Sequence, residues 1–250
     1  MTKFLYKYGS FENDRRNYLR EVLLNDRIFF SNPYRFNDPF DCRPRLEIGT
    51  SKQDREHAKN EIFMILCERF PQATEQQSKR EADLVLARIE NYYDNLSNQY
   101  EILLKKYGVY CLSTKCENLL MWAHYGAGHT GYCLEFDASE GSFFNNAFEV
   151  HYQKNYPVIN VFRSDPERGK KAILTKSLDW AYEEEWRLTS SENGYMDFPS
   201  HDLIGIIFGC KTKIEDIEDV KKLIELREQH MRMRRAVMND RHYKLDLIEL

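Results

Sequence analysis

The 250-residue sequence lacks the features of most membrane-bound and secreted proteins. Its opening residues, MTKFLYKY, contain no apolar signal region, and no apolar run approaches the roughly 20 residues that cross a bilayer. We therefore expect a cytoplasmic protein whose six cysteines are reduced. None of these cysteines forms a C-x-x-C pair, which argues against zinc, and we expect no resident metal.

An excess of positive charge and the common catalytic signatures are also missing. The net charge is −4 and the isoelectric point is near 6.0, so binding to nucleic acid would need a local basic patch. The sequence has no P-loop, no G-x-G-x-x-G loop, no G-x-S-x-G elbow and no H-E-x-x-H pair. The glycines at 126, 128 and 131 follow a predicted helix instead of opening one, which argues against a phosphate loop.

The apolar pattern predicts a single α+β domain over residues 1–250, with a mixed or antiparallel sheet. Period-two and continuous apolar runs predict strands at 4–8, 27–31, 108–114, 131–137, 147–152, 182–189, 203–209 and 243–250. Helical spacing predicts helices at 12–25, 117–125, 165–181 and 214–232, and an inserted helical hairpin at 52–106. The strand at 203–209 is the most apolar and should be central. The charged surface of the insertion favours a structural or partner-docking arm.

An acidic segment, Trp180–Leu188, carries three adjacent glutamates between two tryptophans. As a strand, it would place Glu183, Glu185 and Arg187 on one face and Glu184 on the opposite, core-facing side. As a solvated helix, it would contain a Glu183–Arg187 pair worth roughly 0.2–0.5 kcal/mol. Taken alone, the segment leaves these two interpretations equal.

Two further polar clusters favour the strand. Tyr6 and Lys7 lie on the first predicted strand, and Ser113 and Thr114 end a middle strand. Individually, strand lysines are usually solvated and a Ser-Thr pair often caps the next helix. In chain order, however, a cation, a hydroxyl pair and an E-x-E motif follow one another on three strands. That combination is more specific than any one of its parts.

This motif order resembles the ADP-ribosyltransferases, in which an Arg or His, a Ser-Thr-Ser-like motif and a catalytic glutamate occur in sequence. The resemblance implies an ADP-ribosyltransferase-like sheet and NAD as substrate. It implies that Glu185 is catalytic, stabilising the positive charge that develops as nicotinamide leaves, and that Glu183 positions the acceptor. The implied NAD-binding residues are Tyr6, Lys7, Ser113 and Thr114. Lys7 in place of Arg and Lys115 in place of a third Ser depart from the family pattern.

The chain also resembles an uncharacterised bacterial and phage domain family of unknown function. The shared motifs include L-Y-K-Y at 5–8, F-N-D-P-F-D at 36–41, M-W-A-H-Y at 121–125 and Y-E-x-E-W-R at 182–187. They add Asn37, His124 and Tyr125 to the predicted binding residues. The simpler alternatives are an Asx-turn in the loop and core packing of the aromatic helix.

We therefore expect an enzyme that transfers ADP-ribose from NAD to a protein or nucleic acid, or hydrolyses NAD, as a toxin or phage-defence effector. One alternative is a non-catalytic nucleotide or nucleic-acid binding module whose helical insertion docks a partner or a second copy. Another is a metal-dependent nuclease with Asp38, Asp41, Glu183 and Glu185 as ligands. The nuclease interpretation is weaker because Arg187 stands where many such sites have a lysine.

Overall fold

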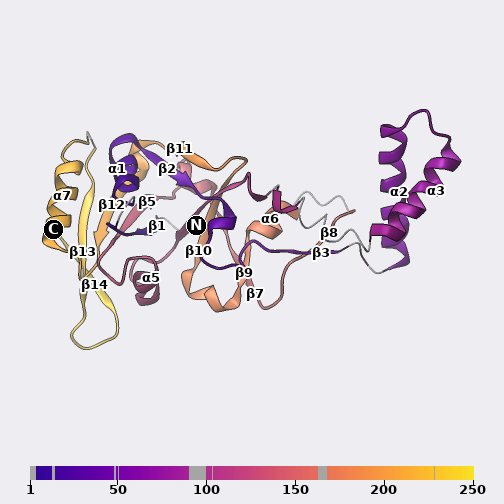
Figure 1. Ribbon diagram of the computed structural model, residues 1–250. Coiled ribbons are helices and arrows are strands. Elements are labelled where there is room, and N and C mark those ends of the chain that lie inside the picture. The colour runs from indigo at the N-terminus through magenta and orange to yellow at the C-terminus, as the bar shows by residue number, and fades with distance from the viewer. Residues whose placement is uncertain are drawn as a thin grey trace.

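Eight strands form one mixed sheet in the order β14-β13-β12-β5-β1-β4-β10-β6 (Figure 1). The structure, a computed structural model, describes residues 4–12, 15–47, 49, 51–89, 100–102, 104–162, 168–227 and 229–250. The α+β class and the mixed sheet are as predicted. Strands β12 and β13 run parallel, and the other neighbouring pairs are antiparallel.

The strands of this sheet are β1 (Phe4–Gly9), β4 (Gly108–Ser113), β5 (Tyr132–Asp137), β6 (Phe148–Glu149), β10 (Glu185–Ser190), β12 (Leu203–Phe208), β13 (Arg232–Met238) and β14 (Leu245–Glu249). Three two-stranded pairs accompany it: β2 (Arg27–Phe30) with β11 (Gly194–Asp197), β3 (Arg45–Glu47) with β8 (Val158–Asn160), and β7 (His151–Gln153) with β9 (Thr175–Ser177). The helices are α1 (Arg15–Asn25), α2 (Lys52–Arg69), α3 (Glu75–Ile89), α5 (Leu119–His124), α6 (Arg168–Ile173) and α7 (Ile214–Ile224). The short 3-10 helices are η1 (Pro33–Arg35), η2 (Phe143–Asn146), η3 (Leu178–Glu183) and η4 (Ser200–Asp202).

Helices cover both faces of the sheet, because its strands direct apolar side chains to both faces. On one face, α1 and α7 bury their apolar stripes against Tyr132, Leu134 and Phe208. On the other face, α5 packs Met121 and Trp122 against β1, β5 and β12. Because successive strand residues point to opposite faces, β5 contributes to both layers and is buried along almost its whole length.

Several predicted boundaries are wrong because long-range strand pairing overrides local pattern. The predicted helix at 165–181 is α-helical only over α6, and its last residues, 178–181, belong to the 3-10 helix η3. Residues 175–177 instead pair with β7, and 163–167 lie outside the described residues. The predicted helix at 214–232 ends at Ile224, and its last residue begins β13, which pairs with β12. The strand predicted at 147–152 divides at Val150, whose N–H donates to the Glu185 carbonyl at 2.9 Å.

The acidic segment also differs from its prediction. The strand begins at Glu185, because Glu184 adopts a left-handed conformation with φ of 43° and ends η3. Glu184 is exposed and does not face the core. The apolar strand predicted at 203–209 is interior, between β13 and β5, while β5 and β1 occupy the middle of the sheet.

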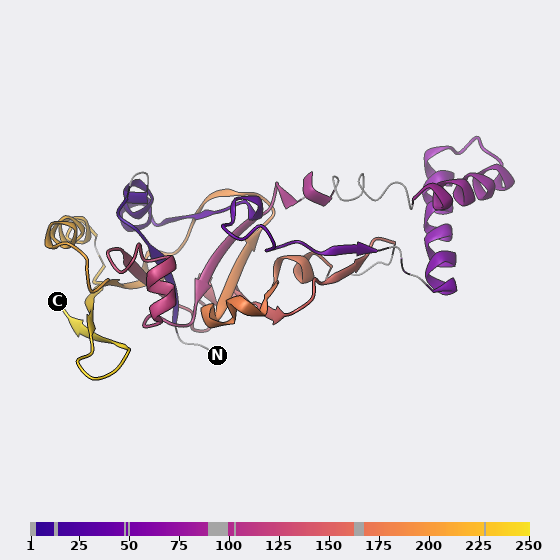
Figure 2. The ribbon, with the colours of Figure 1, turned by 60° about the horizontal axis from the view of Figure 1, so that its bottom comes forward.

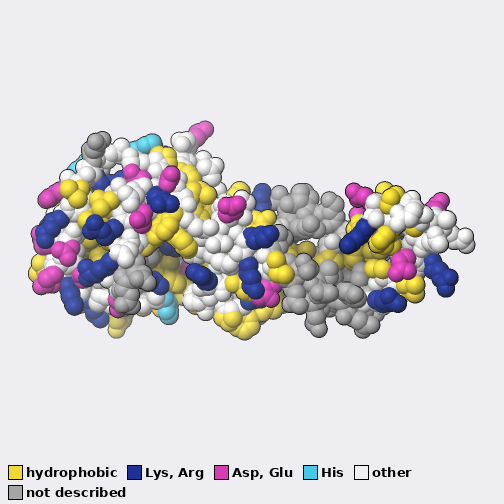
Figure 3. All heavy atoms as spheres, turned by 45° about the horizontal axis from the view of Figure 1, so that its top comes forward, with side chains coloured by type: hydrophobic (Ala, Val, Ile, Leu, Met, Phe, Trp, Pro, Cys, Tyr) yellow, Lys and Arg dark blue, Asp and Glu magenta, His cyan; other side chains and the backbone are white. Residues whose placement is uncertain are grey.

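Helices α2 and α3 form the predicted hairpin and project from one end of the sheet (Figures 1 and 2). They pack together through a small cluster around Ile62 and Ala82. Charged side chains of both signs are interspersed on the arm's surface (Figure 3). Residues 90–99 of the predicted insertion lie outside the described residues. Every described helix is too short or too polar to span a bilayer.

The glycine at 131 is required by a close approach of two backbones at the start of β5. A Cβ on Gly131 would lie 2.1 Å from the Gly9 carbonyl oxygen. The backbone there cannot move freely, because the Gly131 carbonyl accepts hydrogen bonds from the Gly209 N–H at 2.9 Å and the Thr212 hydroxyl at 2.8 Å.

We expect Gly131→Ala to lower the free energy of unfolding by about 2–3 kcal/mol, because the added methyl group overpacks a fixed backbone contact. The matched control is Gly169→Ala in α6, where a Cβ would meet no atom within 4 Å. That change should be neutral or stabilise by up to about 1 kcal/mol. Urea unfolding measures both, and equal midpoints for the two variants would contradict the steric argument.

Candidate functional site

A buried cluster of five charged side chains lies at the edge of the main sheet. Its members are Asp41, Lys176, Glu183, Glu185 and Arg187, and each is at most 7% exposed. They come from the loop after η1, from β9, from the end of η3 and from β10. Buried charges are stable only when they are paired and hydrogen-bonded, so the contacts within this cluster determine whether the site can exist.

Arg187 is completely buried and uses all five of its N–H donors. Its Nε and Nη2 donate to the two oxygens of Glu185, both at 2.8 Å. Its Nη1 and Nη2 donate to the two oxygens of Asp41 at 3.1 and 2.7 Å. The remaining Nη1 donor bonds the Ile173 carbonyl at 2.5 Å. One guanidinium therefore fixes two carboxylates by bidentate contacts, which a lysine could not reproduce.

Lys176 supplies the second cation of the cluster. Its Nζ lies 2.5 Å from Glu183 Oε2, 3.0 Å from Glu185 Oε2 and 3.6 Å from Asp41 Oδ2. Three carboxylates thus face two cations. With every group ionised, the cluster carries one excess negative charge.

The two glutamates differ in their electrostatics. Burial opposes ionisation of Glu185, but Arg187 and Lys176 outweigh it and hold the pKa of this carboxyl well below its ordinary value of 4.5. At Glu183, burial dominates and raises the pKa, although Lys176 and the hydroxyl of Tyr125 partly offset it. Glu185 is therefore the more firmly ionised member of the pair.

The local backbone explains how Glu183 joins the cluster although it lies outside the strand. Ser177 caps η3 by accepting from the Asp179 N–H, and the left-handed Glu184 ends this 3-10 helix. The Ser113 hydroxyl then donates to the Glu183 carbonyl at 2.6 Å. Beyond the turn, the Glu185 N–H donates to the Tyr152 hydroxyl at 2.8 Å. These bonds direct both glutamate side chains to the same side.

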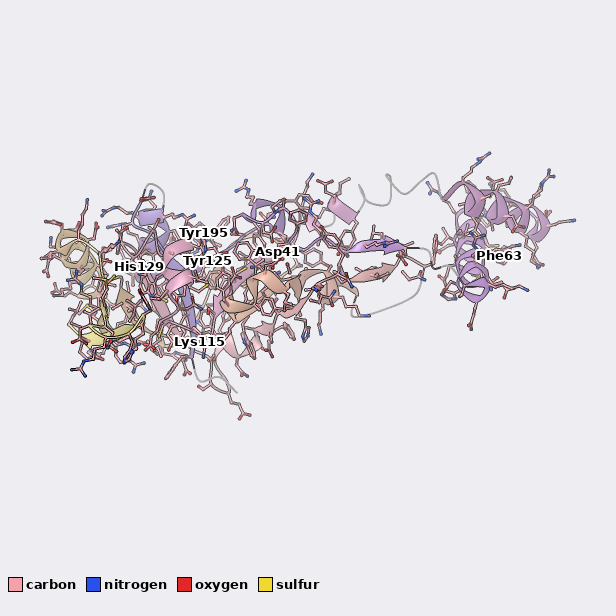
Figure 4. The ribbon with its side chains drawn as sticks, turned by 90° about the horizontal axis from the view of Figure 1, so that it is seen from below. Asp41, Phe63, Lys115, Tyr125, His129 and Tyr195 are labelled. Carbon is pink, nitrogen blue, oxygen red and sulfur yellow. The ribbon has the colours of Figure 1, made fainter. Side chains whose placement is uncertain are left out.

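A cleft of about 630 Å³ opens beside the cluster. Its lining residues include Tyr125, Tyr195 and Asp41, which are labelled in Figure 4. Three cations outside the ionic cluster, Lys7, Arg15 and Arg35, also line it, together with Lys176. The predicted residues that line the cleft are Tyr6, Lys7, Asn37, Ser113, His124, Tyr125, Glu183 and Glu185.

Tyr125 connects this cleft to the ionic cluster. Its hydroxyl donates to Glu183 Oε1 at 2.7 Å, and the amide of Asn37 approaches the same hydroxyl at 3.5 Å. Burial and the adjacent carboxylate raise the pKa of this tyrosine. His124 is exposed beside Tyr125, with its ring centroid 6.4 Å from that of Trp180 and 6.2 Å from that of Tyr182.

The first-strand residues occupy different environments. The Lys7 ammonium donates to the Cys111 carbonyl at 2.8 Å and lies over the Tyr110 ring. Burial lowers the pKa of Lys7. The Tyr6 hydroxyl donates to Glu135, a buried carboxylate that also pairs with Arg234. Tyr6 thus has a structural partner already.

Ser113 and Thr114, the predicted hydroxyl pair, lie in different surroundings. Ser113 is buried and hydrogen-bonded to backbone atoms. Thr114 is half-buried, donates to Glu184 at 2.7 Å and does not line the cleft. The predicted Asx-turn is made by Asp38, which accepts from the Phe40 N–H at 2.8 Å.

Sequence reasoning missed Lys176, which falls within the helix predicted at 165–181, and did not foresee that Arg187 would bind Asp41. The position of Lys176 depends on the pairing of β9 with β7, more than twenty residues away in the chain. A contact at that separation leaves no periodic signal in the segment itself. The usable signal for the cluster was the two-residue spacing of Glu185 and Arg187, which predicts that both side chains lie on one face of a strand. The structure has both residues on β10.

The nuclease ligand set does not assemble as predicted. Asp38 is held in its turn, and the ammonium of Lys176 occupies the position among Asp41, Glu183 and Glu185 where a cation would lie. A divalent ion there would have to displace this lysine. Among the described residues, no group of three or more His, Cys, Asp or Glu has a metal-binding arrangement.

Comparison with known proteins gives one match. Residues 121–188 match a family model described as "Protein of unknown function (DUF2971)". This confirms the expected resemblance to a domain family of unknown function. The matched segment runs from α5 to β10 and so contains Tyr125, Lys176, both cluster glutamates and Arg187. No curated protein and no solved structure matches the chain.

We expect Arg187→Lys to destabilise the protein by about 3–5 kcal/mol, because it leaves buried carboxylates without their bidentate partner. Arg20→Lys, on the exposed face of α1, is the matched control and should change stability by less than about 0.5 kcal/mol. Urea unfolding of both variants measures the difference. An Arg187→Lys midpoint close to that of the control would show that the guanidinium geometry is not needed.

Glu185 should also make stability depend on pH. Its folded pKa is depressed, so its contribution is present above 4.5 and is lost as pH falls toward the folded pKa. We expect Glu185→Gln to be less stable than wild type at pH 7, with a difference that shrinks by up to about 1.4 kcal/mol per pH unit below 4.5. Urea unfolding at about pH 7, 5, 4 and 3 measures this difference above and below the ordinary glutamate pKa. A constant difference across that range would contradict it.

Proposed function

We propose that this protein is an NAD-using, ADP-ribosyltransferase-like enzyme that transfers ADP-ribose to a macromolecule or hydrolyses NAD. One observation carries the proposal. The three motif strands β1, β4 and β10 are neighbours, and Tyr6, Ser113 and Glu185 are paired across them in one row. Lys7, Glu183 and Glu185 then line a single cleft.

The charge distribution of the cleft supports a pyrophosphate ligand. Arg15 and Arg35 are exposed, line the cleft with Lys7, and form no ion pair with another described residue. Guanidinium groups suit bidentate phosphate contacts, which Lys7 alone could not make. Arginines from α1 and η1 would thus supply the guanidinium contacts that are lost because Lys7 stands in place of an arginine in the first motif.

The glutamate end of the cleft supports the departure of nicotinamide. The excess negative charge of the cluster would stabilise a ribosyl cation in a site partly shielded from water. Glu185, firmly ionised and held by Arg187, would act electrostatically. Glu183 would position the acceptor through Oε1, the oxygen that Tyr125 now contacts.

The cellular role extends the same proposal. A cytoplasmic toxin or phage-defence effector is consistent with the expected resemblance to a bacterial and phage domain family. The acceptor in this setting would be a host or phage macromolecule.

Nicotinamide release from NAD tests the activity, and the three consecutive glutamates provide matched variants. We expect Glu185→Gln to reduce the rate by at least about 100-fold, as the loss of an electrostatic stabiliser does elsewhere. Glu183→Gln should impair transfer, and Glu184→Gln, at an exposed position, should leave the rate unchanged. Circular dichroism of each variant checks folding. Equal rates for wild type and a folded Glu185→Gln would refute a catalytic role.

A non-catalytic nucleotide-binding module is the second candidate, and the saturation of the cluster favours it. Arg187 has no free donor, and Lys176 contacts three carboxylates, so the site is preorganised but its charges are already paired. In that case NAD or ADP would raise the melting temperature of wild type and of Glu185→Gln alike, with no nicotinamide released.

A further inference from the structure

A second cavity, of about 690 Å³, opens on the other side of Lys176. The cleft of the proposed NAD site and this second cavity are both lined by Lys176. The other walls of the second cavity come from the loop at 38–43, the segment 153–157 after β7, and η3. Its lining includes Asp38 and Phe40 of the F-N-D-P-F-D motif and Tyr182 of the acidic segment.

Four aromatic side chains line the second cavity. Phe40 is 64% exposed and Tyr156 is 47% exposed, although both are large and largely apolar. Trp180 and Tyr182 are half-buried, and their ring centroids are 6.0 Å apart. Exposed rings around a concave surface are stacking platforms, and unpaired nucleobases stack on such rings whatever their sequence.

The polar groups of the second cavity favour a negatively charged strand. Arg43 is exposed and lies over the Tyr34 ring with its guanidinium carbon 4.2 Å from the centroid, and Lys154 is exposed in the loop after β7. The two acids in the lining are already engaged. Asp38 accepts from a backbone N–H, and Asp179 accepts from the Ser177 hydroxyl at 2.9 Å. These hydrogen bonds orient the two acids without cancelling their charge, so the cavity offers a phosphate backbone two exposed cations, Arg43 and Lys154, of which Arg43 also donates to the Tyr34 hydroxyl at 3.1 Å.

The two cavities communicate through side chains. The His124 ring, which lines the cleft, contacts Trp180 and Tyr182, which line the second cavity. Lys176 lies over the Trp180 ring at 5.2 Å and bonds Glu183. Lys176 therefore stands between a base stacked in the second cavity and Glu183, which lines the cleft.

We propose that the second cavity binds an unpaired base of single-stranded nucleic acid, with Phe40 and Trp180 stacking on it and Arg43 and Lys154 contacting phosphates. Its role in holding an acceptor strand, whose reacting base would enter the cleft beside Glu183, rests on the proposed function. Transfer would form a bond between a base nitrogen or oxygen and the anomeric ribose carbon. Nicotinamide would leave with the electron pair of the broken glycosidic bond, and the acceptor's proton would pass to the Glu183 carboxylate.

Binding is measured without NAD, by fluorescence anisotropy of labelled single-stranded DNA and RNA of about 12 nucleotides. We expect Phe40→Ala and Trp180→Ala each to weaken binding at least about tenfold, because each removes a stacking ring. The matched control is Phe70→Ala, which removes another exposed phenylalanine ring, at the C-cap of α2 on the arm. It should bind as wild type does.

The phosphate contacts have a separate readout. Lys154→Gln should lower the slope of log affinity against log salt by about 0.7, as expected for one lost contact to a single strand. Lys52→Gln, an exposed lysine on α2, should leave the slope unchanged. Equal slopes for Lys154→Gln and wild type would overturn the assignment of this lysine.

Any of three outcomes would overturn the proposal as a whole. One is that neither oligonucleotide binds. Another is that both ring variants bind as tightly as wild type. The third is that an acidic peptide competes for the site and binds more tightly than either strand. NAD hydrolysis measured without nucleic acid tests the proposed function separately. Binding without turnover would leave the second cavity intact and remove only the acceptor role.

Discussion

The structure around the site depends on one guanidinium. Arg187 is fully buried, and it is stable there only because Asp41, Glu185 and the Ile173 carbonyl together accept from every one of its donors. These partners come from the loop after η1, the end of α6 and β10 itself. By holding them at once, Arg187 fixes the loop after η1 and the end of α6 against β10.

Lys176 extends this arrangement to the functional surface. Its ammonium links Glu183 to Glu185 and forms part of the wall between the cleft and the second cavity. The buried cluster is therefore both a structural joint and the common border of two candidate binding sites. Because its charges are paired, an incoming ligand meets a preorganised field instead of flexible side chains. The same pairing is what makes pure ligand binding a serious alternative to catalysis.

The local apolar pattern of the sequence was sufficient to predict the positions of the strands and helices that have strong periodicity. The strands at β1, β4, β5 and β12 and the helices α1 and α5 lie close to their predicted positions, because each buries an amphipathic or apolar run against its neighbours. Prediction failed where a segment had weak periodicity and a distant partner. Thr175–Ser177 and Arg232–Met238 became strands only because β7 and β12 offered unpaired edges.

The sequence by itself determined the order of the motif strands and the shared face of Glu185 and Arg187, because strand alternation is a local property. It also placed Tyr6, Lys7, Asn37 and Tyr125 among the candidate residues of one pocket. Only the tertiary structure decided that Lys176 and Asp41 join the glutamates, that Ser113 is buried and that Thr114 lies outside the cleft. The physical reason is that a buried charge selects its partners by distance in space, which separation along the chain does not reveal.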